Sequence, residues 1–143
     1  MFKLKDECCD ARTGKLKLRS GTIDTPFFMP VGTKASVKNL SPRQLKKTGT
    51  TCIIANSFVL SLRPGSKLIE ENGGLHKFMG WDGGIFTDSG GFQAGSKDFL
   101  VEVNDKGIKF RNPYLGKAEI LTPEDAVRIQ EELKSDVCMA LDD

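Results

Sequence analysis

The chain has 143 residues, a length that fits one domain or one piece of a larger domain. Its 21 basic and 19 acidic residues leave a net charge of +2, which is too balanced to indicate nucleic-acid binding by overall charge and too mixed for a disordered tail. No apolar run reaches the roughly 18 residues of a membrane span, and the polar start lacks the apolar core of a signal peptide. A cytoplasmic location is therefore the default expectation.

The first third of the chain predicts a β-hairpin, a buried strand and a short helix. Residues 12–29 alternate between apolar and polar side chains around a Ser-Gly turn, as paired strands do. Residues 27–32 then form an apolar run that predicts a buried strand entering a glycine-containing loop. The next helix starts at Ser41, where Ser as N-cap, Pro at the first helical position and Gln three residues on form a capping box. It ends before Gly49.

The middle of the chain predicts two strands separated by short helices. Residues 51–57 are an apolar run that ends in polar residues, and residues 66–71 and 75–81 have the pattern of short helices. The second strand ends at Asp88 and breaks at once into Ser-Gly-Gly-Phe-Gln, residues 89–93. A change from strand to turn at an acid is therefore expected here.

The last third predicts an inserted antiparallel meander, one long helix and a final strand. Residues 99–121 contain three alternating segments separated by turn sequences. Thr122 and Pro123 begin a helix whose core-facing positions follow helical spacing: Ala126, Val127, Ile129, Gln130 and Leu133. Residues 136–143 predict a buried strand that ends in two acids.

Four apolar strands thus end in polar residues, after Val31 and at Asn56, Asp88 and Asp142. Repeated β–α units predict a parallel sheet, and the polar strand ends predict one shared site at its carboxyl edge. Four such strands are half of an eight-stranded barrel. The expected fold class is therefore α/β: half of a TIM-type (β/α)8 barrel with an amino-terminal hairpin and an inserted meander. We expect its open edge to need a partner.

The four cysteines do not have the spacing of a zinc knuckle or a redox pair. Cys52 and Cys138 lie in apolar runs and are expected to be buried free thiols. Cys8 and Cys9 are adjacent in a polar segment that we expect to be exposed. No metal ligands are predicted within this chain.

Two interpretations of Asp88 are open from the local pattern. A buried strand that delivers a carboxylate to its carboxyl end, followed by glycines that let a ligand approach the backbone, is a common way to build a site on an α/β fold. Alternatively, Asp88 accepts hydrogen bonds from turn amides and has no chemical role.

Five motifs, in order over nearly the whole chain, resemble the tRNA-guanine transglycosylase (queuine tRNA-ribosyltransferase) family. They are Met-Pro-Val-Gly-Thr at 29–33, Asn-Ser at 56–57 with Leu-Arg-Pro-Gly at 62–65, Gly-Leu-His-Lys-Phe-Met at 74–79, Thr-Asp-Ser-Gly-Gly-Phe-Gln at 87–93, and Leu-Asp-Asp at 141–143. The resemblance covers the family's amino-terminal half. It implies a modified TIM barrel that exchanges a guanine in tRNA for a 7-deazaguanine base of the queuine type.

The resemblance gives the site residues their expected roles. Asp142 is similar to the acid that recognises the donor edge of the base, and Asp88 to the carboxylate that moves protons to and from the leaving and entering bases. Phe92 would stack on the base and Asn56 would add a polar contact. The remaining base-binding positions form the turn after Asp88: Ser89, Gly90 and Gly91. The alternatives are that Asp142 caps a following helix and that Phe92 is a core residue.

Two parts of the family's chemistry are expected outside these 143 residues. The carboxylate nucleophile and the zinc site, formed by three cysteines and a histidine, belong to the family's carboxyl-terminal half. The expected partners are tRNA, a 7-deazaguanine base, and a carboxyl-terminal half or a second copy in a homo-oligomer. One hypothesis is an amino-terminal half of a transglycosylase that works only with a carboxyl-terminal half. The other is a non-catalytic relict or binding module that folds alone or as a dimer.

Overall fold

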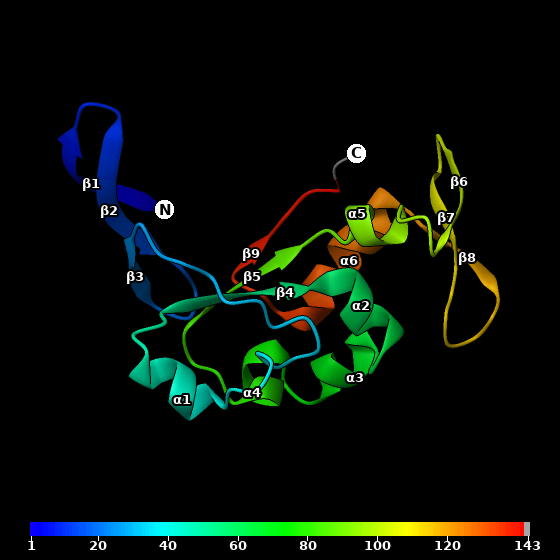
Figure 1. Cartoon of the computed structure of the whole chain (residues 1–143), viewed down its shortest axis with the longest axis horizontal. Coiled ribbons are helices and arrows are strands. Elements are labelled where there is room, and N and C mark those ends of the chain that lie inside the picture. The colour runs from blue at the N-terminus through cyan, green and yellow to red at the C-terminus, as the bar shows by residue number, and fades with distance from the viewer. Residues whose placement is uncertain (142–143) are drawn as a thin grey trace.

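The computed structural model describes residues 1–141, a mixed α/β arrangement with three small sheets. The amino-terminal sheet is antiparallel and contains β1 (Phe2–Cys8), β2 (Ala11–Lys17) and β3 (Thr22–Thr25). The hairpin predicted for residues 12–29 is present as β2 and β3, whereas β1 was not predicted. Figure 1 shows this sheet and the meander at opposite ends of the molecule's long axis.

The central sheet is parallel and has the strand order β4-β5-β9. Its strands are β4 (Cys52–Asn56), β5 (Gly84–Asp88) and β9 (Val137–Cys138). Both β4 and β5 are apolar runs that end in a polar side chain, as expected for strands covered by helices. The parallel sheet predicted from the repeated strand ends is therefore present for these three strands.

Helices connect and cover the central strands. In chain order they are α1 (Pro42–Lys47), α2 (Ser57–Leu62), α3 (Ser66–Glu71), α4 (Leu75–Met79), α5 (Gly91–Ala94) and α6 (Pro123–Leu133). The capping box predicted at Ser41 is present, because its side chain accepts from the Gln44 amide and Gln44 accepts from the Ser41 amide. Thr122 and Asp125 form the same motif at the start of α6. The helix α2 and the single turn α5 were not predicted.

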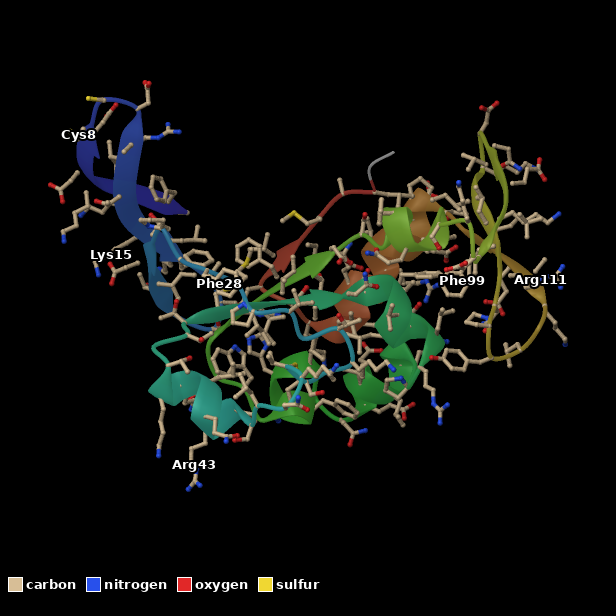
Figure 2. All side chains as sticks on the ribbon, viewed as in Figure 1. Cys8, Lys15, Phe28, Arg43, Phe99 and Arg111 are labelled. Carbon is tan, nitrogen blue, oxygen red and sulfur yellow. The ribbon has the colours of Figure 1, made fainter. Side chains whose placement is uncertain are left out.

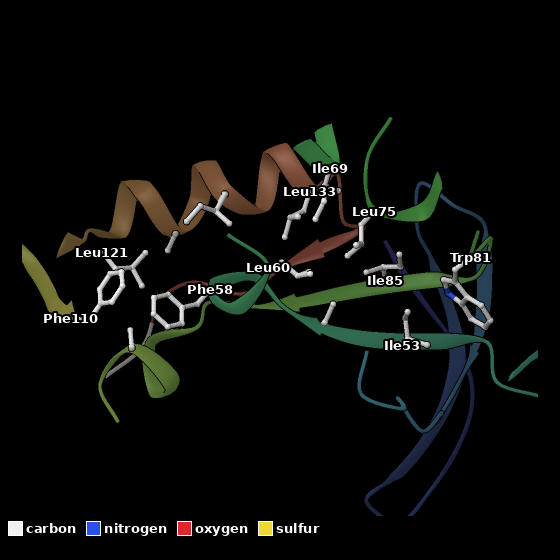
Figure 3. Close-up of a cluster of buried hydrophobic side chains, with 14 of the residues drawn as sticks. Ile53, Phe58, Leu60, Ile69, Leu75, Trp81, Ile85, Phe110, Leu121 and Leu133 are labelled. Carbon is white, nitrogen blue, oxygen red and sulfur yellow. The ribbon is translucent and has the colours of Figure 1, made fainter. Parts of the chain in front are cut away.

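The hydrophobic core lies between one face of the central sheet and the helices. Ile53 of β4 and Ile85 of β5 point into it, with Leu60, Leu75 and Leu133 from three helices, and none of the five has exposed surface. Figure 3 shows α6 crossing above β4 and β5 with these side chains between them. Full burial of one such side chain stabilises the fold by about 2–3 kcal/mol. This layer therefore fixes the orientation of the sheet relative to the helices.

The predicted meander is present as β6 (Leu100–Asn104), β7 (Gly107–Arg111) and β8 (Ala118–Leu121). Phe110 anchors it to the body, because its ring packs edge-on against that of Phe58 with 4.8 Å between centroids. Figure 2 shows Phe99 where the chain enters the meander and Arg111 farther out. The insertion thus extends from the core without being part of the parallel sheet.

The strand predicted for residues 27–32 is wrong in two respects. Only Val31 pairs with the central sheet, through a single parallel bridge to Ile54, and Val31 is 59% and Phe28 81% exposed. Pro26 precedes the segment and Pro30 lies within it, and neither can donate to a ladder. The backbone bonds to Ile54 come from the Gly32 amide and the Pro30 carbonyl. Figure 2 shows Phe28 near the middle of the molecule.

Burial was also predicted wrongly near the end of the chain. Within residues 136–141, ladder pairing of the strand predicted for residues 136–143 is confined to Val137 and Cys138, and Cys138 is exposed instead of buried. Within the described residues, β9 is an edge strand, so one of its sides is uncovered. Val127 of α6 is likewise 48% exposed, because it lies on the side of the helix away from the sheet.

Three parallel strands and one bridge form an open sheet among residues 1–141, and no closed barrel is present there. The α/β class is confirmed, whereas the half-barrel stays a prediction. In the same part of the chain, no helix is both long and apolar enough to cross a membrane.

Candidate active site

The candidate site lies where β4 and β5 end. Asn56 is the last residue of β4 and Asp88 the last of β5, and the parallel register pairs them directly. Strand alternation puts Asn56 on the same face as Ile54, and Asp88 on the same face as Phe86. The sequence predicted that the two strand ends would share one edge, and this juxtaposition is confirmed.

The Asn56 side chain joins the two strands. Its Nδ2 donates to Asp88 Oδ2 at 3.1 Å, and its Oδ1 accepts from the Val59 amide at 2.8 Å, which makes Asn56 the N-cap of α2. A backbone N–H can only donate, so it directs the amide oxygen toward α2 and the NH₂ group toward Asp88. Asn56 is 4% exposed and Asp88 is half-buried. Asn56 thus holds the carboxylate in a defined orientation.

The turn after Asp88 packs tightly against α2. Ser57 Oγ donates to the Asp88 carbonyl at 2.6 Å, and the Gly91 amide donates to Ser89 Oγ at 3.4 Å. Gly90 has a φ of +77°, and a Cβ built there would lie 2.1 Å from Phe58 Cβ. Glycine is therefore required at this position by both backbone conformation and space. The absence of a side chain at Gly90 lets Phe58 of α2 pack against the backbone of the turn.

Phe92, on α5, is 86% exposed. The alternative that it is a core residue is therefore wrong. Its ring, two residues beyond Gly90, can therefore stack on a planar ligand. Its neighbour Ala94, by contrast, is fully buried and attaches α5 to the core.

The face of the sheet opposite the core is apolar and only partly covered. Ile54 and Phe86 are half-buried on this face, while Ile53 and Ile85 on the other face are fully buried. The ring of Phe27 approaches that of Phe86, with 6.1 Å between centroids. The pair formed by Asn56 and Asp88 thus lies at the polar end of an apolar surface, an arrangement in which a charged group is partly shielded from water.

Asp142 lies outside the described residues. The chain that leads to it is described up to Leu141, and the backbone of Met139 is bonded by a buried side chain, Gln130 of α6. The sequence-based interpretation placed Gln130 among the core-facing positions of α6 without giving it a role. The only sequence signal was a polar residue within an apolar stripe.

A second polar cluster lies at the other end of the strands and serves the structure. Asp136, which has no exposed side-chain surface, accepts from the amides of Ile85 and Ser20 and from Ser20 Oγ, and His76 Nε2 lies 3.1 Å away. Burial opposes ionisation of Asp136, but these hydrogen bonds and the nearby His76 keep the pKa of its carboxyl below the usual value. The cluster ties the turn between β2 and β3 to the central sheet.

Four lysines lie between β3 and β4 in the sequence: Lys34, Lys38, Lys46 and Lys47. Lys46 forms an exposed ion pair with Asp82 at 2.6 Å, and this pairing lowers the pKa of Asp82. Exposed pairs of this kind contribute little to stability. Within residues 1–141, no group of three or more His, Cys, Asp or Glu side chains is arranged to hold a metal ion, so these residues do not fit a zinc site.

Comparisons with known proteins place the sequence in a family. The family described as "Queuine tRNA-ribosyltransferase" matches residues 6–143. A queuine tRNA-ribosyltransferase of Prochlorococcus marinus subsp. pastoris is 50% identical over 99% of this chain, and one of Nitrosomonas eutropha is also 50% identical over 99%. A third, from Thermoanaerobacter pseudethanolicus, is 48% identical over 97%.

The chain spans 38%, 40% and 37% of these three relatives, respectively. The matched part includes both strand ends that form the site and the turn that follows Asp88. The family match and the three relatives each cover nearly the entire sequence. The chain belongs to the queuine tRNA-ribosyltransferase family.

Proposed function

We propose that this chain supplies part of the active site of a tRNA-guanine transglycosylase, which exchanges a guanine in tRNA for a 7-deazaguanine base of the queuine type. The observation that carries the proposal is the Asn56–Asp88 pair at the carboxyl edge of the parallel sheet. The names of the relatives support it. The chain spans only 38% of one such relative. The activity of the whole enzyme is therefore proposed for this chain.

In this proposal Asp88 transfers protons. Base exchange needs a group that protonates the leaving guanine and deprotonates the entering base, and a carboxylate within hydrogen-bond reach can do both in turn. Asn56 directs one carboxylate oxygen, Oδ2, toward itself. The orientation of Asp88 is fixed by Asn56, and Asn56 is in turn held by the Val59 amide at the start of α2. This arrangement supports a chemical role for Asp88 over a role in the turn.

The base would be held by its edge and its face. Guanine presents N1–H and an exocyclic amino group side by side, and the carboxylate of Asp142 is proposed to accept both. Phe92 is proposed to stack on the ring, which its 86% exposure allows. Ser89, Gly90 and Gly91 would form the backbone wall next to the base. A direct contact between Asn56 and the base stays a prediction.

The remaining chemistry is proposed to come from the part of the family that this chain does not span. That part would contribute the nucleophile that forms the covalent tRNA intermediate, as well as the family's zinc site. The partner that contributes them would be a carboxyl-terminal half that completes the barrel. A homo-oligomer would fit the alternative of a binding module instead, because a second copy of the same residues adds neither group. The apolar sheet face at Ile54 and Phe86 is suited to being covered by such a partner. A cytoplasmic location is part of the proposal.

The test is a base-exchange assay with radiolabelled guanine and whole tRNA. We expect no exchange by the chain alone, and exchange when it is mixed with a polypeptide corresponding to the remaining length of a relative. Asp88→Asn should abolish that exchange with an unchanged melting temperature. Exchange by the isolated chain would refute the need for an external nucleophile, and retained exchange in Asp88→Asn would remove Asp88 from the mechanism.

The same samples test the alternative of a binding module. Size-exclusion chromatography reports whether the chain associates with the added polypeptide or with itself. A chain that binds tRNA but gives no exchange in the mixture would support the binding module and contradict the proposed enzyme.

A further inference from the structure

Gln130 is a polar residue in the middle of the hydrophobic core. It lies on α6 between Ile129 and Leu133, and it has no exposed surface. A buried amide costs free energy unless its hydrogen-bonding groups are satisfied, so its position requires specific partners. Besides the Ala126 carbonyl on its own helix, those partners lie in β5 and in the segment that follows β9.

The amide of Gln130 makes four hydrogen bonds. Its Oε1 accepts from Thr87 Oγ1 at 2.8 Å and from the Met139 amide at 3.0 Å. Its Nε2 donates to the Met139 carbonyl at 2.8 Å and to the Ala126 carbonyl at 3.0 Å. Two acceptor sites and two donor hydrogens are all that an amide side chain has. The hydrogen-bonding capacity of the amide is therefore fully satisfied, and the orientation of the amide plane is fixed.

Two of these bonds act on Met139 as a strand partner would. Gln130 binds both the N–H and the C=O of this residue, which is the pairing that a neighbouring strand provides in a ladder. The strand β9 has only two residues, and its ladder continues only through the Met139 amide, which also donates to the Thr87 carbonyl at 3.1 Å. Gln130 thus extends the hold on the chain beyond Cys138.

The third contact connects this hold to the other strand. Thr87 immediately precedes Asp88 in β5, and Met139 stands three residues before Asp142 in the sequence. Thr87 Oγ1 also lies 2.7 Å from Ser135 Oγ, so the link is itself supported by a second buried hydroxyl. One amide therefore joins the chain segments that precede both acids.

We propose that Gln130 is a positioning residue for base recognition, which sets the spacing between the strand that carries Asp88 and the segment that continues to Asp142. This inference rests on the proposed function. Displacement of a reacting or recognition group by about 1 Å can cost on the order of 100-fold in rate, so the site requires this spacing to be fixed. Gln130 acts through the backbone and needs no contact with the substrate.

The test compares Gln130→Met with Leu133→Ala in the exchange-competent mixture described above. Methionine retains the length of glutamine but cannot form the amide's hydrogen bonds. Leu133→Ala removes fully buried surface one turn away on the same helix and serves as the control for lost stability. Both are assayed at a temperature at which urea unfolding shows each variant folded.

We expect Gln130→Met to raise the KM for the 7-deazaguanine base by about tenfold while the KM for tRNA stays unchanged. Leu133→Ala should leave both KM values unchanged. Equal base KM values in the two variants, or a parallel change in the KM for tRNA, would overturn the inference. If Gln130→Met does not fold, Thr87→Val removes the link from Gln130 to β5, together with the contact to Ser135 Oγ, and should raise the base KM by about threefold.

Hydrogen exchange separates this inference from the proposed function. Protection of the Met139 amide should fall in Gln130→Met and persist in Leu133→Ala. If the wild-type mixture exchanges no base, the proposed function fails. Unchanged Met139 protection in Gln130→Met, by contrast, refutes the positioning role alone.

Discussion

The side-chain amide of Asn56 donates to the carboxylate of Asp88 across the parallel β4–β5 pair, at a distance of 3.1 Å. The same amide caps α2 through the Val59 N–H. One residue therefore ties the orientation of the proposed acid–base group to the start of a helix. These two functions of Asn56 can be separated by mutation.

Asn56→Asp should retain the cap and remove the hold on Asp88. Asp is as good an N-cap as Asn, so the start of α2 should be retained, whereas Asn56→Ala removes the cap at a cost of about 1 kcal/mol. The free energy of unfolding of Asn56→Asp should still fall at neutral pH, because a second buried carboxylate then faces Asp88. The new carboxylate cannot donate to Asp88 and repels it. Base exchange by Asn56→Asp should drop at least about tenfold, as measured with labelled guanine. Equal exchange in wild type and Asn56→Asp would argue against orientation of Asp88 by Asn56.

Phe92→Ala should weaken base binding without affecting the fold. The ring is 86% exposed, so its removal should change the free energy of unfolding by no more than about 0.5 kcal/mol. Loss of stacking should weaken binding of the base by about 1–3 kcal/mol, as measured by calorimetry on the exchange-competent mixture. Phe28→Ala, which removes another ring that is 81% exposed, is the matched control. An equal loss of affinity in both variants would count against stacking by Phe92.

Gly90→Ala should destabilise the chain more than Gly49→Ala does. Both glycines have a left-handed φ, +77° and +79°, which costs an alanine about 1–2 kcal/mol. A Cβ at Gly49 meets no atom within 4 Å, whereas one at Gly90 lies 2.1 Å from Phe58 Cβ. The difference between the two urea unfolding free energies measures the packing cost at the turn, which we expect to exceed about 1 kcal/mol. Equal unfolding free energies for the two variants would show that α2 can move to accept the new methyl group without an energetic cost.

Asp136 should make stability fall in acid. Its folded-state pKa is held below the usual value, so its contribution is present above the unfolded pKa of about 3.9 and is lost as the pH falls through the folded pKa. Urea unfolding between about pH 2 and pH 6 should show this decline, and Asp136→Asn should flatten it. An unchanged decline in Asp136→Asn would assign the acid sensitivity to other carboxyls.

Alkylation at neutral pH should spare one of the four cysteines. Cys52 is buried, and burial together with the nearby Asp136 raises the pKa of its thiol to about 12, so it stays protonated and inaccessible. Cys8, Cys9 and Cys138 are exposed and should react with iodoacetamide in the native chain. Peptide mass spectrometry gives the modified positions. Labelling of Cys52 at the rate of Cys138 would contradict the packing of β4.

The sequence alone predicted the elements whose causes are local. The capping box at Ser41 depends on residues three positions apart and is present, and the helix predicted to begin at Thr122 and Pro123 does begin there. The apolar runs that end at Asn56 and Asp88 indicated two neighbouring parallel strands, because continuous burial requires cover on both sides. The family was also evident from motifs of the sequence, and the comparisons confirm it.

Burial near the edges of the sheet could not be predicted from the sequence. Val31, Phe28 and Cys138 lie in apolar runs but are exposed, because burial depends on whether another element covers them. The close approach of Gly90 to Phe58 and the bond from Thr87 to Gln130 join residues far apart in the chain. No periodicity encodes such contacts.

The residues of the site and their chemical types were thus determined by the sequence, since a carboxylate, an amide and an aromatic ring follow strands that its apolar runs define. What only the tertiary structure decided is how they are held. The register of β4 with β5 brings Asn56 to Asp88, and the packing of α2 and α6 on the sheet directs the amides that fix the strand ends. These distances result from the summed packing of the core, which is a property of the folded chain and of no single segment.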